Sequence, residues 1–156
     1  QPILEVVSTF AAQPSNTQSQ SESMRKSLVP GVTGEYRHRV VTENLVSFRK
    51  PGAPAVMSTP WVLYAMETAA YEAIRPHLDA TEDSVGVGFE FEHLAATPPG
   101  DTLVATATIT AVEGNKVMLD FEARDSHELV AKGKHVRAVI DQARFQKRLQ
   151  RKPSSS

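Results

Sequence analysis

The sequence predicts an α+β domain in which an antiparallel sheet of about five strands wraps around one long central helix. One helical segment, residues 60–74, stands between a single strand-like segment and four more that follow it. These four segments are joined by short connections, which suit antiparallel pairing and exclude repeated strand–helix–strand units. The length of 156 residues fits one such domain.

The first strand and the helix are indicated by alternation and by capping residues. Residues 35–41 alternate as a strand does, and residues 42–50 are consistent with a short helix capped by Thr42. A Pro-Gly-Ala-Pro break follows at 51–54. Thr59 as N-cap with Pro60 after it is a favourable helix start, and Pro76 ends the helix. The predicted apolar face is formed by Leu63, Met66, Ala70 and Ile74.

Four strands are predicted after the helix, at residues 84–93, 102–112, 116–124 and 130–140. A turn at 113–115, Glu-Gly-Asn, joins the second of them to the third. In the first of them one face carries Val85, Val87, Phe89 and Phe91, and the other carries Glu90 and Glu92.

The two ends of the chain differ from the middle. Residues 1–30 are predicted to form an N-terminal extension, because the stretch 12–21 is polar and of low complexity. Residues 31–145 form the predicted domain, and residues 146–156 a basic tail. Five basic residues lie between positions 144 and 152, which suits a solvated helical tail or an electrostatic contact with a phosphate-bearing ligand.

The composition excludes several classes of function. The 17 Lys and Arg residues nearly balance the 18 Asp and Glu residues, so the net charge of -1 argues against nucleic acid as a partner. The absence of cysteine excludes disulfides, thiolate zinc sites and a cysteine nucleophile. No apolar run approaches the roughly 20 residues of a transmembrane helix, so we expect no membrane partner and a cytoplasmic location.

Two polar side chains fall where apolar ones are expected. Glu67 lies on the apolar face of the helix, where it is either an edge residue that reaches water or a buried carboxylate that needs a partner. His93 continues the odd-numbered face of its strand, at the end of that strand. A histidine in this position is either a satisfied core residue or a ligand or catalyst.

Thr59 is the third candidate. Its hydroxyl either caps the helix or lies beside the helix N-terminus, where backbone N–H groups stabilise a developing oxyanion. A hydroxyl, a carboxylate and an imidazole that converge near a helix start would form an acyl-transfer site.

Other chemistries lack their motifs. The sequence has no G-x-S-x-G nucleophile elbow and no Walker A loop, and Gly86-Val87-Gly88 is a fragment of a dinucleotide motif inside a strand. The histidines show no H-x-x-x-H spacing. Glu92 and His93 are strand neighbours that point to opposite faces, and so are His127 and Glu128, so no metal site is expected.

Five motifs spread over residues 31–145 point to a family. They are Met66-Glu67, Ser84-Val85-Gly86, the run His-Leu-Ala-Ala-Thr-Pro-Pro-Gly at 93–100, Val-Glu-Gly at 112–114 and Gly-Lys-His-Val-Arg-Ala-Val-Ile at 133–140. This region resembles the hot-dog-fold acyl-CoA thioesterases of the fluoroacetyl-CoA thioesterase type. The resemblance implies a hot-dog fold and hydrolysis of an acyl-CoA thioester, with no cofactor beyond the coenzyme A of the substrate.

The resemblance also implies roles for individual residues. The family's catalytic trio falls on Thr59, Glu67 and His93, its strand glycine near the thioester on Gly86, and its substrate-proximal arginine on Arg137. In the mechanism we expect, Thr59 polarises or attacks the carbonyl, Glu67 is nucleophile or general base, and His93 shuttles protons. Arg137 orients the substrate or a carboxylate. Both a covalent acyl-enzyme and direct attack by water remain open.

The resemblance further implies a homodimer with joined sheets and a site at the subunit interface, which would also protect a sheet edge. One stretch departs from the family: residues 48–56 are short for its lid and carry Ala53 where an aromatic gate would stand. A general short-chain or aryl acyl-CoA is therefore expected rather than a fluorinated one. The rivals are a non-catalytic hot-dog domain that binds acyl groups or dimerises, and a hydratase, which needs an Asp and a His that residues 49–59 lack.

Overall fold

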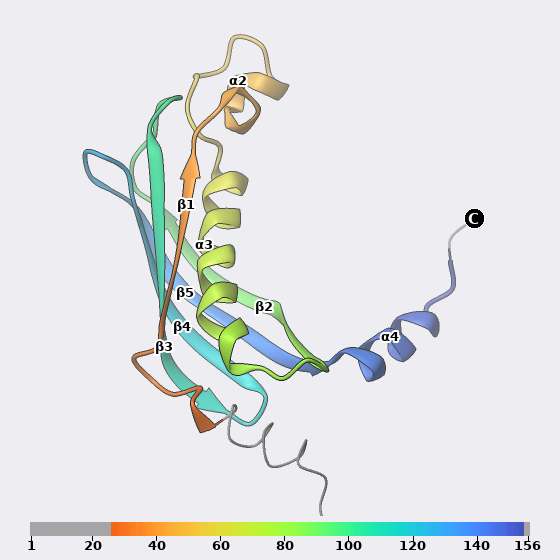
Figure 1. The fold of residues 1–156 in the computed structure, drawn as a ribbon. Coiled ribbons are helices and arrows are strands. Elements are labelled where there is room, and N and C mark those ends of the chain that lie inside the picture. The colour runs from red at the N-terminus through yellow and green to blue at the C-terminus, as the bar shows by residue number, and fades with distance from the viewer. Residues whose placement is uncertain (1–25, 155–156) are drawn as a thin grey trace, which may run out of the picture.

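The computed structural model describes residues 26–154, in which a five-stranded antiparallel sheet curls around a central helix (Figure 1). The strand order is β1-β3-β4-β5-β2, so β1 and β2 are the two edges. This confirms the predicted α+β class. The elements are β1 (Thr33–Arg39), η1 (Thr42–Asn44), α2 (Val46–Arg49), α3 (Thr59–Ile74), η2 (Arg75–His77), β2 (Glu82–His93), β3 (Thr102–Glu113), β4 (Lys116–Arg124), β5 (Leu129–Asp141) and α4 (Gln142–Gln150).

The central helix α3 lies against the concave face of the sheet through small side chains. Its buried residues are Val62, Ala65, Met66, Ala69, Ala70, Ala73 and Ile74. Leu63 is only partly buried, so the apolar stripe is centred slightly away from the predicted one. Gly34 of β1 allows the closest approach, because a Cβ there would collide with the backbone of Ala69 and Ala73.

The start of α3 differs from the prediction by one residue. Ser58 is the N-cap and Thr59 is already the first helical residue, followed by Pro60. The predicted capping role of Thr59 is therefore wrong. Thr42 is likewise not a cap, because Val41 precedes η1 as its N-cap and a separate short helix, α2, follows.

A β-bulge in β2 corrects the predicted face of this strand. Gly86 pairs with Arg137 and Gly88 with Val136, so Val87 is an extra residue between them. The bulge shifts by one position the alternation of side chains between the two faces of β2. Ser84 is buried while 56% of Val87 is exposed, so the prediction is wrong for Val85 and Val87.

Beyond the bulge, the odd-numbered residues of β2 do face the helix side, as the sequence predicted. Phe91 packs against the core there. His93, at the end of the strand, pairs with Ala131 of β5.

The two ends of the described chain flank this core. The predicted extension, residues 1–30, lies mostly outside the described residues, as does the end of the predicted tail at 155–156. Residues 142–150 form α4, which extends away from the sheet (Figure 1). In residues 26–154 no helix is long and apolar enough to span a membrane.

Candidate active site

The first turn of α3 and the last residue of β2 bring Thr59 and His93 together. Thr59 Oγ1 lies 2.9 Å from His93 Nδ1, a hydrogen bond between residues 34 positions apart in the chain. The Thr59 hydroxyl is thus directed at an imidazole rather than at its own helix. A hydroxyl paired with a ring nitrogen is the arrangement that activates an alcohol or holds it for hydrogen bonding to a substrate.

The other ring nitrogen of His93 is buried and unpaired. Nε2 has no hydrogen-bond partner among the described residues, although a buried polar atom is normally satisfied. His93 also lines a shallow pocket of about 280 Å³ with Met57, Leu94 and Ala95 among its neighbours. This nitrogen is therefore available to a group that residues 26–154 do not supply.

The distinctive loop after His93 is anchored by its threonine. Thr97 is fully buried, its hydroxyl donates to Asp125 at 3.1 Å, and its carbonyl accepts from the backbone N–H of Met57 at 2.8 Å. These contacts tie the end of β2 to the segment that leads into α3. The loop motif thus has a structural part in holding His93 against Thr59.

The second set of predicted residues gathers around a guanidinium. Arg137 Nη1 donates to Glu67 Oε1 at 3.1 Å, and the same arginine donates from Nε to Ser84 Oγ at 3.0 Å and from Nη2 to the Ser84 carbonyl at 2.8 Å. Its guanidinium also lies over the ring of Tyr71, 5.6 Å from the centroid. Arg137 is therefore fixed by protein groups on several sides.

Glu67 sits at the rim of the helix face rather than within it. Its side chain is 45% exposed, whereas that of Arg137 is 4% exposed. Of the two interpretations of Glu67, the edge position is the one observed. A carboxylate anchored through one oxygen and open to solvent is placed to meet a substrate or a second chain.

Gly86 makes room for this carboxylate. A Cβ at position 86 would lie 3.1 Å from Glu67 Oε1, 3.2 Å from His135 Cε1 and 3.7 Å from Arg137 Nη1. The β2 strand thus passes close to the pair because it has no side chain at this point.

The two sets of residues are separate within one chain. Glu67 follows Thr59 by eight helical positions, about 12 Å along the axis at 1.5 Å per residue. The hydrogen-bond partner of Glu67 is Arg137, and that of Thr59 is His93. The predicted trio is thus brought together in part: Thr59 with His93, and Glu67 with Arg137 and Gly86.

Sequence reasoning missed His135, which is buried beside Arg137. Its ring stacks on Phe89 with centroids 3.8 Å apart, and its Nε2 lies 3.3 Å from Arg137 Nη1. Desolvation by burial, with the nearby Arg137 charge, lowers the pKa of His135, against opposing effects of the Gly88 carbonyl and Glu67. One signal was available: His135 alternates with Gly133 and Arg137 on the buried face of β5.

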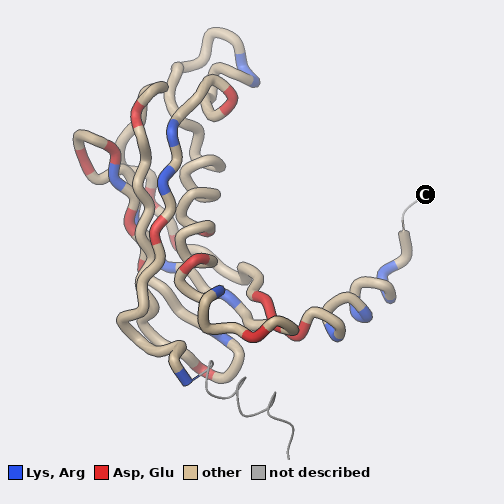
Figure 2. The backbone as a smooth tube through the Cα atoms, viewed as in Figure 1, with Lys and Arg blue, Asp and Glu red and all other residues tan. Residues whose placement is uncertain are grey.

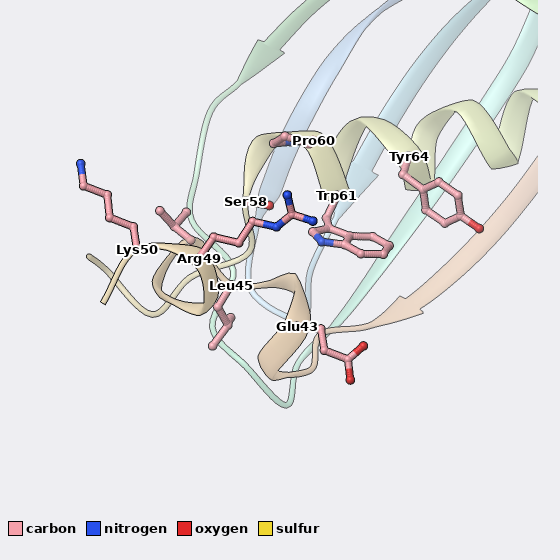
Figure 3. A pocket seen from close by; sticks show the side chains of 9 residues that line it. Glu43, Leu45, Arg49, Lys50, Ser58, Pro60, Trp61 and Tyr64 are labelled. Carbon is pink, nitrogen blue, oxygen red and sulfur yellow. The ribbon is translucent and has the colours of Figure 1, made fainter. Parts of the chain in front are cut away.

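A larger pocket lies on the other flank of the α3 N-terminus (Figure 3). It has a volume of about 680 Å³ and is lined by α2 and the outer face of α3, with Trp61 and Tyr64 as its aromatic walls. None of the predicted site residues lines it. Trp61 and Tyr64, which line this pocket, also form an aromatic cluster with Tyr36 and His38 of β1.

The basic tail is confined to α4 and the residues after it. Figure 2 shows its cations on a segment that stands clear of the sheet. Asp141 caps this helix by accepting from the backbone N–H of Arg144 at 2.9 Å. The basic residues 147, 148, 151 and 152 are exposed, so the observed tail is a solvated one and the contact with a phosphate-bearing ligand stays a prediction.

Comparisons with known proteins bear on this arrangement. A sequence profile of the fluoroacetyl-CoA-specific thioesterases matches residues 40–143. The fluoroacetyl-CoA thioesterase of Streptantibioticus cattleyicolor is 35% identical over 99 residues, which are 64% of this chain and 71% of that protein. The profile match includes the segments that carry both sets of site residues.

Solved structures share the fold. A variant of the fluoroacetyl-CoA thioesterase, solved in complex with acetyl-CoA, superposes with a TM-score of 0.73 at 30% identity, over 80% of this chain and 98% of that one. A hot-dog-like protein from Thermanaerovibrio acidaminovorans superposes with a TM-score of 0.75 at 30% identity, over 84% and 98%. The curled sheet around α3 is thus a hot-dog fold.

Proposed function

The chain belongs to the family of fluoroacetyl-CoA-specific thioesterases, and we propose that it hydrolyses its acyl-CoA at a site shared between the two protomers of a homodimer. Thr59 and His93 of one protomer face Glu67 of the partner subunit. The observation that carries this proposal is the separation of the two sets of residues along α3. Among the described residues the Thr59–His93 pair has no carboxylate hydrogen-bonded to it, and the Ser84 hydroxyl and the His135 ring near Glu67 are both engaged by Arg137.

Pairing of the β2 edges accounts for this separation. Gly86 of β2 adjoins Glu67, and His93 at the end of β2 adjoins Thr59. When two copies of an edge strand pair antiparallel, the start of one lies near the end of the other. If Gly86 of each protomer lies opposite His93 of the other, the two-fold axis falls between Phe89 and Glu90 and brings the Glu67 region of each protomer toward the Thr59–His93 pair of its partner.

The β2 edge has the character of a covered surface. Val87 and Phe89 are 56% and 38% exposed in the single chain, and within residues 26–154 the strand has a partner, β5, on one side only. An open edge with apolar side chains invites aggregation unless another chain covers it. The unpaired His93 Nε2 also gains a partner if the interface closes over it.

The proposed chemistry begins at the helix N-terminus. The N-cap residue of α3, Ser58, makes no side-chain capping hydrogen bond, and the first turn of a 16-residue helix carries partial positive charge. A thioester carbonyl at Thr59 would place its oxygen in this field. Charge that develops on that oxygen is stabilised there, while the Thr59 hydroxyl donates to it or attacks the carbonyl carbon.

Glu67 and His93 complete the reaction. Glu67 attacks the carbonyl carbon directly or removes a proton from the attacking water, and Arg137 fixes the carboxylate for either role. His93 passes a proton toward the departing sulfur through the nitrogen that Thr59 does not occupy. The carbon–sulfur bond breaks and the thiol of coenzyme A leaves. With attack by water the acid is formed at once, and with a covalent acyl-enzyme a water then hydrolyses the acyl bond, so either route consumes one water and yields the free acid and the thiol.

The acyl group we propose is a short-chain or aryl group without strong preference for fluoroacetyl. The lid region between β1 and α3 has one aromatic residue, Phe48, which is 54% exposed. Ala53 stands where the resemblance leads one to expect an aromatic gate. A small residue there leaves the acyl pocket less tightly closed. The pocket then has no side chain in contact with the fluorine atom, so it distinguishes fluoroacetyl from acetyl groups poorly.

The test is release of free thiol from a panel of acyl-CoAs by wild-type protein, Glu67→Gln and the matched control Glu72→Gln. Glu72 lies on the same helix in an exposed ion pair with Arg75. We expect turnover of at least one panel member, a loss of roughly 100-fold or more in Glu67→Gln, and wild-type rates in Glu72→Gln. The panel contains acetyl, fluoroacetyl, medium-chain and phenylacetyl thioesters.

The outcomes separate the hypotheses. Turnover that persists in Glu67→Gln would remove this carboxylate from the mechanism. No turnover by a folded dimer across the panel would favour the acyl-binding module or a thioester on a carrier protein. A strong fluoroacetyl preference would contradict the lid argument while leaving the trio intact.

A further inference from the structure

We infer that His135 is a positioning residue of the thioesterase site, because its neutral ring holds Arg137 in the orientation that presents Glu67. This inference rests on the proposed function of Glu67. It concerns a residue outside the trio, buried beside the guanidinium.

The two hydrogen bonds of His135 fix its protonation state. Nδ1 lies 2.8 Å from the carbonyl oxygen of Gly88, and a carbonyl can only accept, so Nδ1 carries the proton. Nε2 lies 3.3 Å from Arg137 Nη1, and a guanidinium can only donate, so Nε2 carries a lone pair. Both partners therefore select the same neutral tautomer.

The surroundings of the ring favour that neutral form. His135 is 1% exposed, stacked on Phe89 from β2 and near Phe121 from β4. The charged groups that face it are Arg137 on β5 and Glu67 on α3. Burial lowers the pKa of His135, so the ring stays an acceptor for Arg137 at neutral pH.

The contact matters because one nitrogen of Arg137 serves two partners. Nη1 donates to Glu67 Oε1 at 3.1 Å and also faces His135 Nε2. Nε and Nη2 are occupied by Ser84. Ser84 fixes one side of the guanidinium and His135 the other. Together they determine the orientation of the guanidinium plane that donates to the Glu67 carboxylate.

A pair of substitutions separates positioning from packing. His135→Phe keeps an aromatic ring to stack on Phe89 but has no acceptor for Arg137. His135→Gln loses the ring and its stacking but can place an amide oxygen where Nε2 lies. A purely structural role predicts that the Phe variant is active and the Gln variant is impaired, whereas positioning predicts the reverse.

The experiment measures kcat and KM for thioester hydrolysis by both variants, with melting temperature and dimer mass as folding controls. We expect kcat of His135→Phe to fall about 10- to 100-fold with KM changed less than about threefold, since a shift of up to 1 Å in a catalytic group costs up to about 100-fold. The kcat of His135→Gln stays within about threefold of wild type. If His135→Phe does not fold, the Gln variant decides, because a folded Gln variant with strongly reduced kcat contradicts positioning.

Glu67→Gln in the same assay distinguishes the two proposals. If Glu67→Gln is inactive and His135→Phe retains wild-type kcat, the role of His135 is refuted and the proposed function stands. If Glu67→Gln is fully active, the role of Glu67 fails and the inference about His135 fails with it, although hydrolysis itself stands; no turnover by the wild-type dimer would instead refute the proposed function.

Discussion

Addition of one carbon at Gly86 should displace the Glu67 carboxylate, which we propose to be catalytic, by a small and calculable distance. The Cβ of Gly86→Ala would lie 3.1 Å from Glu67 Oε1 and 3.2 Å from His135 Cε1. Both separations are a few tenths of an ångström shorter than ordinary contacts. The half-exposed Glu67 side chain can yield, whereas the buried His135 ring cannot.

The size of the effect follows from this displacement. A misplacement of about 1 Å costs up to about 100-fold in rate, so a shift of about 0.3–0.5 Å corresponds to roughly 4- to 10-fold in kcat. Gly86→Val adds two further carbons against the same groups and should reduce kcat by more than about 50-fold. The KM for acyl-CoA should change little if Glu67 acts on the reacting carbon rather than on the ground-state substrate.

The assay is free-thiol release at saturating acyl-CoA, with Gly88→Ala as the matched control. A Cβ at Gly88 meets nothing within 4 Å, and the carbonyl of Gly88 remains in place. The open space at Gly88 is that of the single chain and this residue lies on the proposed β2 interface, so dimer mass is measured alongside the rate; for a Gly88→Ala variant that remains dimeric we expect a rate within about twofold of wild type. Equal rates for Gly86→Ala and wild type, or equal losses in both alanine variants, would refute the argument that β2 needs a bare backbone beside Glu67.

Two further predictions concern the hydroxyl and the buried ring. Thr59→Val should lower kcat by about 100-fold and Thr59→Ser by less than about fivefold, because the hydroxyl and not the methyl group meets His93; free-thiol release checks this, with Thr68→Val as an exposed control. The pKa of His135 is lowered in the folded protein, whereas in the unfolded chain the ring protonates near pH 6.5. Its contribution to the free energy of unfolding is therefore fully present above pH 6.5. That share should fall as the pH drops toward the lowered folded pKa, by up to about 1.4 kcal/mol per pH unit. Urea midpoints between pH 5 and 7.5 check this, and His135→Gln should show a shallower slope; an equal slope would contradict the assignment.

The fold could be predicted because its signals are local. The single helix between one strand and four, and the turn around Gly114, follow from alternation and from breaker residues. The prediction of the buried face of β2 was wrong before Val87, where one extra residue shifts the alternation of buried and exposed side chains. An inserted residue at Val87 reverses the face of the strand before it, and no local signal besides the neighbouring glycines marks that bulge.

The site could be predicted only in part, because its geometry depends on contacts between distant residues. Spacing placed Thr59 at the helix start, but only the fold reveals that its hydroxyl meets His93 instead of capping the helix. Glu67 and Arg137 are 70 positions apart, and no sequence pattern in either segment predicts that they form an ion pair. His135 was overlooked because a search for metal spacing does not detect a histidine that orients an arginine.

We propose that each active site combines Thr59 and His93 of one protomer with Glu67 of the partner subunit. The most direct test co-expresses Thr59→Val and Glu67→Gln chains with two different affinity tags and purifies the mixed dimers. Each mixed dimer then contains one intact site and one doubly altered site, so we predict about half of the wild-type activity per dimer, although both parent homodimers are reduced about 100-fold or more. Mixed dimers as inactive as their parents, or a chain that remains monomeric, would contradict the shared site.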